Sequence, residues 1–144
     1  MLVFIVQMPR KKQLVKLINI PKIFDDCHLC FLQTSEHVKF PIKRVFYILN
    51  RYTKMPRGYH AHKKTKQVLF CIQGSIKIIL DDGNKREAVI LNQPEVGVFI
   101  GNGVWHEMHN FNKNTILLVI ASRKYDANDY IRDYNLFIKF VNEK

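Results

Sequence analysis

The stretch "RGYHAHKKTKQVLFCIQG", residues 57–74, decides the fold. It places two histidines on either side of one alanine and continues into an apolar, β-branched run that ends at a glycine. Because residues two apart on a strand point to the same face, His60 and His62 project together. Two imidazoles on one face are suited to binding a metal ion or to moving a proton, since histidine titrates near neutral pH.

The chain around this stretch has the same β pattern. Between about residues 14 and 121, short β-branched and aromatic runs alternate with turn residues and show little helical periodicity. The sequence "DDGNK", residues 81–85, offers the positive φ values of a hairpin turn. We therefore expect an all-β sandwich or barrel. The expected strands are 15–18, 28–33, 43–49, 59–63, 67–73, 75–80, 88–91, 97–100, 104–110 and 115–121.

The last segment, "DANDYIRDYNLFIKFVNEK" at 126–144, has a helical period instead. Its apolar residues recur every three or four positions. Asp126 can cap a first turn and Asp129 suits the positive end of the helix dipole. The pattern predicts a short C-terminal α-helix, roughly 126–143, in a single domain spanning 1–144. The stripe that would lie on the sheet consists of Tyr130, Tyr134, Phe137, Ile138 and Val141.

Composition and charge narrow the class of partner. The 144 residues are 47% hydrophobic and carry a formal net charge of +11, which fits a folded chain that attracts anions. The basic residues are scattered and no nucleic-acid-binding motif occurs, so we expect a phosphorylated small molecule and no nucleic acid. The apolar opening, residues 1–8, is too short to cross a membrane and has its basic residues on the wrong side for a signal peptide. No membrane association and a cytoplasmic location are expected.

The cysteines point to a reducing compartment. Cys27, Cys30 and Cys71 are an odd number, which suits free thiols better than disulfides. The "CHLC" at 27–30 has the spacing of a zinc site, but no second ligand pair of matching spacing follows it. We expect no structural zinc there.

Two stretches resemble the motifs of the cupin superfamily. His60-x-His62, four residues, Gln67, six residues and Gly74 is similar to the first cupin motif, HxH(x)4E(x)6G. Gly103-x-x-His106-x-x-x-Asn110 is similar to the second. The resemblance implies a cupin (jelly-roll) β-barrel in which His106 faces the interior with His60 and His62.

Gln67 stands where metal-binding cupins have a glutamate. A neutral amide gives a divalent cation an oxygen ligand but no charge. Three histidines can still hold zinc in some catalytic sites, so a metal remains an alternative. We predict no metal and no cofactor.

A narrower resemblance covers nearly the whole chain, from "KLINIPKI" at 16–23 onward. "KRVFYI" at 43–48, "RGYHAHKKTKQ" at 57–67, "LDDG" at 80–83, "WHE" at 105–107 and "KYDANDYIRDYNLF" at 124–137 are similar to the nucleotide-sugar 3,4-ketoisomerases. These enzymes act on thymidine diphosphate (dTDP)-4-keto-6-deoxyglucose in routes to 3-amino-3,6-dideoxy sugars of bacterial glycans. The resemblance also implies a homodimer with exchanged N-terminal strands. "DDCHLCFLQT", at 25–34, departs from the family pattern and places Cys27 and His28 at the turn and Gln33 at an acid position.

Moving a ketone from carbon 4 to carbon 3 requires a base with a pKa near neutrality and donors for the developing enolate, without a redox cofactor. The resemblance implies that His62 is the principal base and His60 its neighbour in orientation or proton relay. Tyr47 is expected to donate to the ketone or enolate. The residues expected to contact the substrate are Arg57, Arg44 for the pyrophosphate, Gln67 and His106. On an ideal strand Arg44 and Tyr47 face opposite ways, so only one need point inward unless the strand bulges.

Other functions stay open on the sequence alone. A nucleotide-sugar 3,5-epimerase also abstracts protons beside a ketone on a cupin barrel. Three further alternatives follow, in decreasing order of agreement with the sequence: a metal-dependent cupin dioxygenase, a non-catalytic nucleotide-sugar-binding cupin and a nucleic-acid-binding protein.

Overall fold

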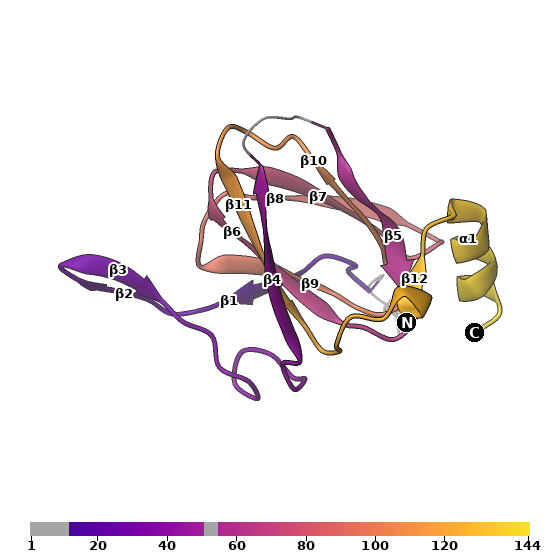
Figure 1. Ribbon diagram of the computed structural model, residues 1–144, viewed down its shortest axis with the longest axis horizontal. Coiled ribbons are helices and arrows are strands. Elements are labelled where there is room, and N and C mark those ends of the chain that lie inside the picture. Colours follow the sequence, from indigo (N-terminus) through magenta and orange to yellow (C-terminus); the bar gives the residue numbers. More distant parts are fainter. Residues whose placement is uncertain (1–11, 51–54) are drawn as a thin grey trace, which may run out of the picture.

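Two antiparallel five-stranded sheets face each other and form the body of the protein (Figure 1). The computed structural model describes residues 12–50 and 55–144; the apolar opening at 1–8 lies outside the described residues. The first sheet has the order β1-β9-β6-β11-β4, with β1 Lys16–Asn19, β9 Val96–Ile100, β6 Gln67–Gln73, β11 Thr115–Ala121 and β4 Arg44–Asn50. The second has the order β12-β5-β10-β7-β8, with β12 Tyr130–Ile131, β5 Arg57–His62, β10 Trp105–His109, β7 Ile76–Asp81 and β8 Arg86–Leu91. The predicted all-β cupin barrel with a short C-terminal helix is confirmed.

The main core fills the space between the two sheets. It consists of alternate residues of the facing strands, as strand periodicity requires, and these side chains are almost fully buried. Leu69, Ile78 and Leu117 are each at most 1% exposed. A second cluster around Phe70 lies on the other face of the first sheet, beneath the loop that contains Val38 and Phe40. The sheets are therefore held rigidly at the positions that carry the site.

The C-terminal segment differs from the single helix expected over 126–143. Asp126 caps a 3-10 helix, Ala127–Asp129, and the chain then extends into β12 beside β5. The α-helix α1, Tyr134–Asn142, begins only after a second cap, where the Asp133 carboxylate accepts from the Leu136 backbone N–H at 2.9 Å. The prediction was wrong for 126–133 because two caps divide this segment.

Helix α1 covers the outer face of the second sheet. Phe137 is fully buried against Trp105, with ring centroids 5.6 Å apart, and Ala61 and Ile131 complete this cluster. Within residues 12–50 and 55–144, no helix is both long and apolar enough to cross a membrane. The helix thus fastens the end of the chain to the sheet that carries the histidines.

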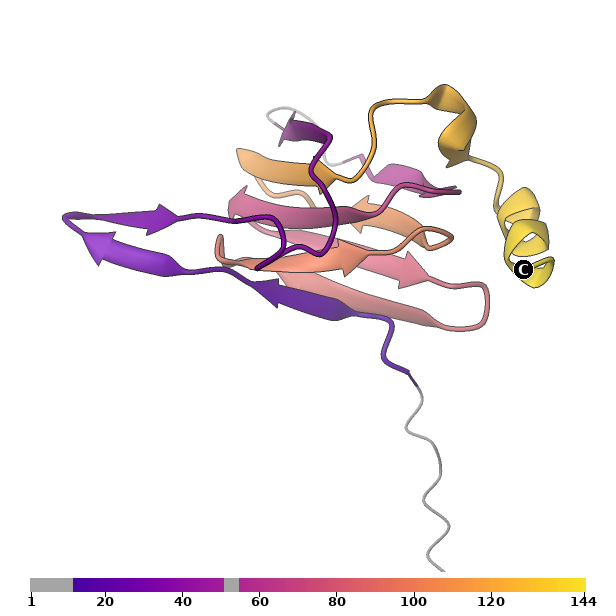
Figure 2. The same ribbon diagram turned by 90° about the horizontal axis from the view of Figure 1, so that it is seen from below.

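A β-hairpin projects away from the barrel, on the side opposite α1 (Figures 1 and 2). It consists of β2, Lys22–Asp25, and β3, Cys27–Cys30, joined at Asp26, whose φ is 58°. We call it the arm. One strand at 28–33 was expected here; the turn at Asp26 ends β2 and places the second strand earlier, at 27–30. Among the described residues the arm is a sheet of its own.

Candidate active site

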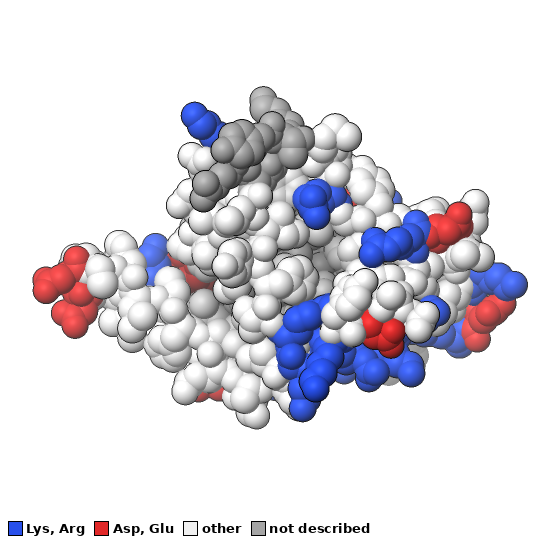
Figure 3. Space-filling view, viewed as in Figure 1, with Lys and Arg blue, Asp and Glu red and all other residues white. Residues whose placement is uncertain are grey.

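A cavity of about 200 Å³ lies inside the barrel, between β4, the edge strand of the first sheet, and β5 of the second. Figure 3 shows the hollow on this face, with Lys and Arg side chains beside it. The polar side chains that line the cavity are Arg57, His60, Gln67, His106, Tyr130 and Arg132. It therefore combines basic groups, suited to an anion, with several imidazoles.

A β-bulge in β5 places Arg57 on the same side as His60. The two are three residues apart and would face opposite ways on an ideal strand, but the register with β10 shifts at this point. Gly58 and Tyr59 have positive φ values of 88° and 55°. A Cβ on Gly58 would lie 2.8 Å from the carbonyl oxygen of His106, so this close approach of backbones requires glycine.

Three histidines cluster at the cavity: His60 and His106 line it, whereas His62 is not among its lining residues. The ring of His60 lies 4.4 Å from that of His106 and 5.0 Å from that of His62, centroid to centroid. His62 and His106 are 2% and 1% exposed, whereas His60 is partly open to the cavity. One ring nitrogen of each histidine lies within 4.8 Å of those of the other two. The side chains expected to act together are therefore adjacent.

The hydrogen bonds of the three rings fix which nitrogen is free. Nδ1 of His60 lies 3.1 Å from the carbonyl of Gly58, and Nδ1 of His106 lies 3.5 Å from that of Val104. Nδ1 of His62 lies 3.2 Å from Oδ2 of Asp129. Since carbonyl and carboxylate oxygens only accept, each Nδ1 carries the hydrogen and each Nε2 keeps its lone pair. Nε2 of His62 is buried and has no hydrogen-bond partner among the described residues.

Asp129 is the most constrained carboxylate of the site. Its Oδ1 accepts from the Lys64 backbone N–H at 2.7 Å, and its Oδ2 accepts from the Thr65 hydroxyl as well as from His62. Burial alone would raise the pKa of Asp129, but the Thr65 and Lys64 hydrogen bonds and the adjacent His62 lower it. Asp129 therefore stays negative beside His62.

The environment keeps all three imidazoles neutral. Burial lowers the pKa of His60 to about 4, and the neighbouring His62 adds to the shift. Burial lowers the pKa of His106 well below its ordinary value. Burial also lowers the pKa of His62, but there the Asp129 carboxylate opposes the shift. His62 is thus the histidine whose protonated form has an anionic partner, which is what a general base requires.

Gln67 lies in the cavity, almost fully buried, on the strand facing the histidines. One ring nitrogen of each histidine lies close enough to the other two for a histidine metal site, and His62 has the carboxylate partner that often accompanies one. Gln67 supplies no charge where a fourth, anionic ligand would stand. The residues present could hold zinc through three nitrogens but lack the carboxylate of a metal-binding cupin.

Strand β4 faces the cavity with a different set of residues than expected. Phe46 and Ile48 line it, whereas Tyr47 points outward and is 64% exposed, so the prediction that Tyr47 reaches the sugar from this barrel was wrong. Arg44 shares the side of Phe46 and stacks over its ring, 5.2 Å from the centroid. Its Nε is buried and has no hydrogen-bond partner among the described residues. The prediction that Arg44 and Tyr47 face opposite ways is confirmed, but the side of β4 that faces inward is that of Arg44 and not that of Tyr47.

The segment before α1 supplies three residues that sequence reasoning missed. Asp129 orients His62, and Tyr130 packs against His60 and His62, with ring centroids 4.9 and 4.4 Å away. Arg132 lines the cavity and stacks over Tyr130. The sequence did contain an indication of this arrangement. Asp133 is a second possible N-cap, and a helix that begins after it leaves residues 127–132 outside the helix.

Comparison with known proteins gives consistent matches. The family model described as "FdtA: WxcM-like, C-terminal" matches residues 13–142. A TDP-4-oxo-6-deoxy-alpha-D-glucose-3,4-oxoisomerase from Aneurinibacillus thermoaerophilus is 46% identical over 127 residues, covering 88% of this chain and 91% of that protein.

Solved structures agree with this match. A mutant of the 3,4-ketoisomerase QdtA from Thermoanaerobacterium thermosaccharolyticum, in complex with TDP-4-keto-6-deoxyglucose, is 41% identical with a TM-score of 0.86, covering 91% of this chain and 96% of that one. The WlaRB TDP-quinovose 3,4-ketoisomerase from Campylobacter jejuni is 44% identical with a TM-score of 0.82, covering 87% and 97%. The Mycobacterium tuberculosis rmlC epimerase, 14% identical with a TM-score of 0.71 over 85% of this chain and 70% of that one, shares the fold.

Proposed function

The chain belongs to the FdtA, WxcM-like family, and we propose that it is a sugar-nucleotide 3,4-ketoisomerase that acts on dTDP-4-keto-6-deoxyglucose in deoxysugar biosynthesis. The observation that carries the mechanism is the Nε2 of His62, which is buried, has no hydrogen-bond partner among the described residues, and belongs to a ring that Asp129 holds from its other side. His62 does not itself line the cavity, but its ring contacts those of His60 and Tyr130, which do, so we propose that a bound sugar reaches it between these two side chains.

The reaction removes two protons from the sugar and returns two, one on carbon and one on oxygen in each case. The base takes the proton from carbon 3, and the carbon 4 ketone oxygen gains a proton to give an enediol. The enediol then loses the proton of its carbon 3 hydroxyl while carbon 4 receives one, which leaves the ketone at carbon 3. His62 serves as the base, and its protonated form is stabilised by Asp129. His60, which lines the cavity beside it, shares the proton relay.

The remaining groups bind and stabilise charge. Arg57, at the start of β5, and Arg132, directly after β12, line the cavity and suit the phosphate oxygens of a nucleotide sugar. Tyr130 lies beside both catalytic imidazoles and takes the role of hydroxyl donor that was expected of Tyr47. His106 and Gln67 complete the contacts to the sugar. Arg44 does not line the cavity, but it stacks over Phe46, which does, and it stays a candidate for the pyrophosphate. None of these steps requires a metal ion or a redox cofactor.

The proposed function is tested by following dTDP-4-keto-6-deoxyglucose by proton NMR in heavy water, with a chelator present throughout. We expect conversion to the 3-keto sugar, with deuterium entering at carbon 4. Deuterium at both carbon 3 and carbon 5 without ketone migration would identify a 3,5-epimerase instead. Activity that is lost in chelator and restored by zinc or iron would move the three histidines to a metal mechanism, and binding without any exchange would indicate a non-catalytic protein.

We further propose that two copies pair through the arm. The side chains of Ile23, Phe24 and Leu29 are 47%, 71% and 57% exposed, and a two-stranded hairpin is marginally stable without packing. The barrel offers a complementary surface, because a stripe of exposed apolar residues runs along the outer face of edge strand β4. This stripe consists of Val45, Tyr47 and Leu49, which are 57%, 64% and 48% exposed. Exchange of the arms between two copies would cover both surfaces.

The double substitution Ile23→Glu with Leu29→Glu, at two positions paired across the arm on the same face, is expected to convert the dimer to a monomer, because it places two charges in the apolar contact. Light scattering coupled to size-exclusion chromatography measures the mass of each variant. Leu136→Glu, at a 61% exposed position on α1, is the control and should leave the dimer intact. A wild-type protein that elutes as a monomer, or a dimer that survives the double substitution, would contradict the proposed pairing.

A cytoplasmic location fits this function. Cys27, Cys30 and Cys71 are free thiols in the structure, which suits a reducing compartment.

A further inference from the structure

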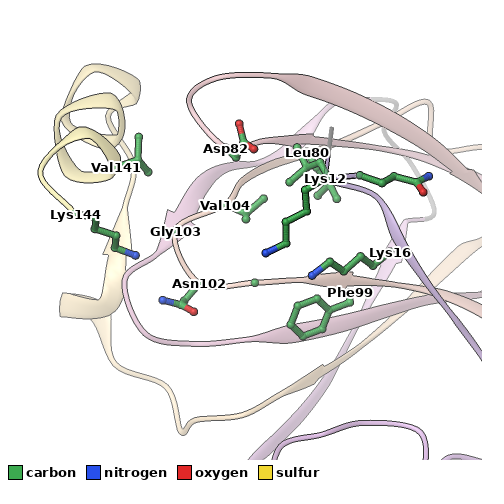
Figure 4. A pocket seen from close by; sticks show the side chains of 13 residues that line it. Lys12, Lys16, Leu80, Asp82, Phe99, Asn102, Gly103, Val104, Val141 and Lys144 are labelled. Atoms are coloured by element: carbon green, nitrogen blue, oxygen red, sulfur yellow. The ribbon is translucent and has the colours of Figure 1, made fainter. Parts of the chain in front are cut away.

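A second, larger pocket lies at the end of the barrel near α1 (Figure 4). Its volume is about 490 Å³, and none of the residues that line it lines the catalytic cavity. Its walls come from the start of β1, the turn before β10 and the end of α1. It is therefore a separate site, within the size range of small-molecule pockets.

Three lysines give this pocket a positive charge. Figure 4 shows the amines of Lys12 and Lys16 pointing into it from one side, and the side chain of Lys144 reaching in from the side of α1. Among the described residues, none of the three makes an ion pair with a carboxylate. Lys16 and Lys144 instead lie over the rings of Phe99 and Phe140, 5.8 and 4.5 Å from the centroids. The three charges attract an anion and lack one within the described protein.

Hydrogen bonds hold the segment that carries Lys12 and Lys16 in place. Oε2 of Glu87 on β8 accepts from the backbone N–H groups of Leu14 and Val15, at 2.9 and 2.7 Å, which ties the segment between Lys12 and Lys16 to the barrel. The one carboxylate in the lining, Asp82, is engaged elsewhere. Its Oδ1 accepts from the backbone N–H groups of Asn84 and Lys85 within its own turn, both at 2.9 Å.

The composition of the walls selects the class of ligand. Leu80, Val104 and Val141 form an apolar wall, and the side chain of Asn102 adds an amide donor beside the lysines. An ammonium group binds phosphate strongly, and several around one pocket favour a ligand with more than one negative charge. A small phosphorylated molecule with an apolar portion matches both the charged and the apolar surfaces.

The turn that forms the floor of this pocket also contacts the catalytic histidines. The Gly103 N–H donates to the carbonyl of His62 at 2.7 Å, and the carbonyl of Val104 accepts from Nδ1 of His106 at 3.5 Å. The Asn102 side chain donates to the carbonyl of Lys63 at 3.3 Å. A ligand that contacts this turn therefore lies one hydrogen bond away from the ring of His106 and from the backbone of His62.

We propose that this basic pocket is a second anion-binding site, distinct from the catalytic cavity, which takes a small phosphorylated molecule on Lys12, Lys16 and Lys144. The proposal does not depend on the reaction assigned to the catalytic cavity.

The test is a titration of the nitrogen-15-labelled full chain with inorganic pyrophosphate, followed by amide NMR. We expect saturable shifts at Gly101, Asn102 and Gly103. In the double variant Lys16→Met with Lys144→Met, the affinity measured at these amides should fall by at least ~10-fold, since two charge-assisted contacts are removed. Lys113→Met, which removes one exposed charge in the turn after β10, is the matched control and should leave the affinity unchanged.

A second variant separates the two sites. Arg57→Met removes a charge from the catalytic cavity, so the shifts at Gly101 and Gly103 should keep their affinity in it. Three results would each overturn the proposal: no saturable shift at the turn, equal affinity in the lysine double variant, or loss of the shifts in Arg57→Met. The last would mean that the shifts are transmitted from pyrophosphate bound in the catalytic cavity.

Discussion

Replacement of His62 by asparagine is expected to lower kcat for dTDP-4-keto-6-deoxyglucose by about 10²- to 10⁴-fold, the usual contribution of a positioned general base. Asparagine retains a polar group of similar size near Asp129 but cannot accept a proton at neutral pH. Deuterium exchange at carbon 3, followed by NMR in heavy water, should fall with kcat, while the affinity for thymidine diphosphate measured by calorimetry should change little. Turnover would then be lost at the proton-transfer step itself.

The matched control is His37→Asn, because His37 lies in the loop beside the first sheet and belongs to neither cavity. It should retain wild-type turnover. His60→Asn separates the two candidate bases. Burial lowers the pKa of His60 to about 4, and a backbone carbonyl is its acceptor, so we expect a smaller loss than in the His62 variant. A larger loss in His60→Asn would assign the base to His60 and leave His62 as its support.

Removal of the Asp129 carboxylate is expected to cause the second-largest loss. Asp129→Ala leaves the Nδ1–H of His62 without its acceptor and should lower kcat by about 10²-fold or more. Asp129→Asn keeps the shape but not the charge. In the wild type, the Lys64 N–H donates to one oxygen of Asp129, and His62 and Thr65 donate to the other. The NH₂ group of asparagine would replace one of these oxygens, so a donor would face a donor on that side. Both variants should therefore be impaired, the alanine more than the asparagine.

The pH profile distinguishes an orienting role of Asp129 from a merely structural one. The base must be neutral to act, so kcat/KM falls as the pH drops through the pKa of His62, which burial places below its ordinary value. Asp129 opposes that shift, so its removal lowers the pKa of His62 further and moves the acid limb of the profile to lower pH. Partial unfolding would reduce the rate without moving the limb.

Asp126→Asn is the control for this pair of variants. Asp126 caps the same short 3-10 helix through its side chain, and asparagine is an equally good cap, so both the rate and the acid limb should stay unchanged. If Asp129→Asn retained the wild-type rate and acid limb, Asp129 would only secure the turn at Lys64 and Thr65, and His62 would act without it.

The sequence was sufficient to predict the barrel and the three histidines, but not Asp129, the carboxylate that orients His62. Strand alternation places His60 and His62 on one face without any knowledge of the fold. Asp129 lies 67 residues away along the chain from His62. Its contact depends on how the segment after the last long strand returns to β5, and in the sequence its apolar spacing continues smoothly into that of α1. Helical periodicity therefore concealed the break, and only the two aspartate caps marked it.

Two further errors have the same physical origin. The alternation of β4 shows that Arg44 and Tyr47 face opposite ways, but both faces carry apolar residues, so the pattern does not indicate which face is inside. The two short strands of the arm carry exposed apolar side chains on both faces. They therefore lack the alternation of buried and exposed residues by which a strand is usually recognised. Both errors fall on the outer surface that we propose to be covered by a second copy.

The late position of Asp129 and Tyr130 has a consequence for the protein while it is being made. A ribosome extends the chain from its amino end at roughly 5–20 residues per second, and folding can begin before synthesis is complete. A nascent chain that has reached Ala121 contains every strand of the two facing sheets except β12, and so it contains His60, His62 and His106. It lacks the carboxylate that orients His62 and the tyrosine that packs against it. With the role proposed here for Asp129, a partly synthesised barrel would have its histidines in place but not the support of its base, and full activity would follow only when residues 126–133 fold back onto β5.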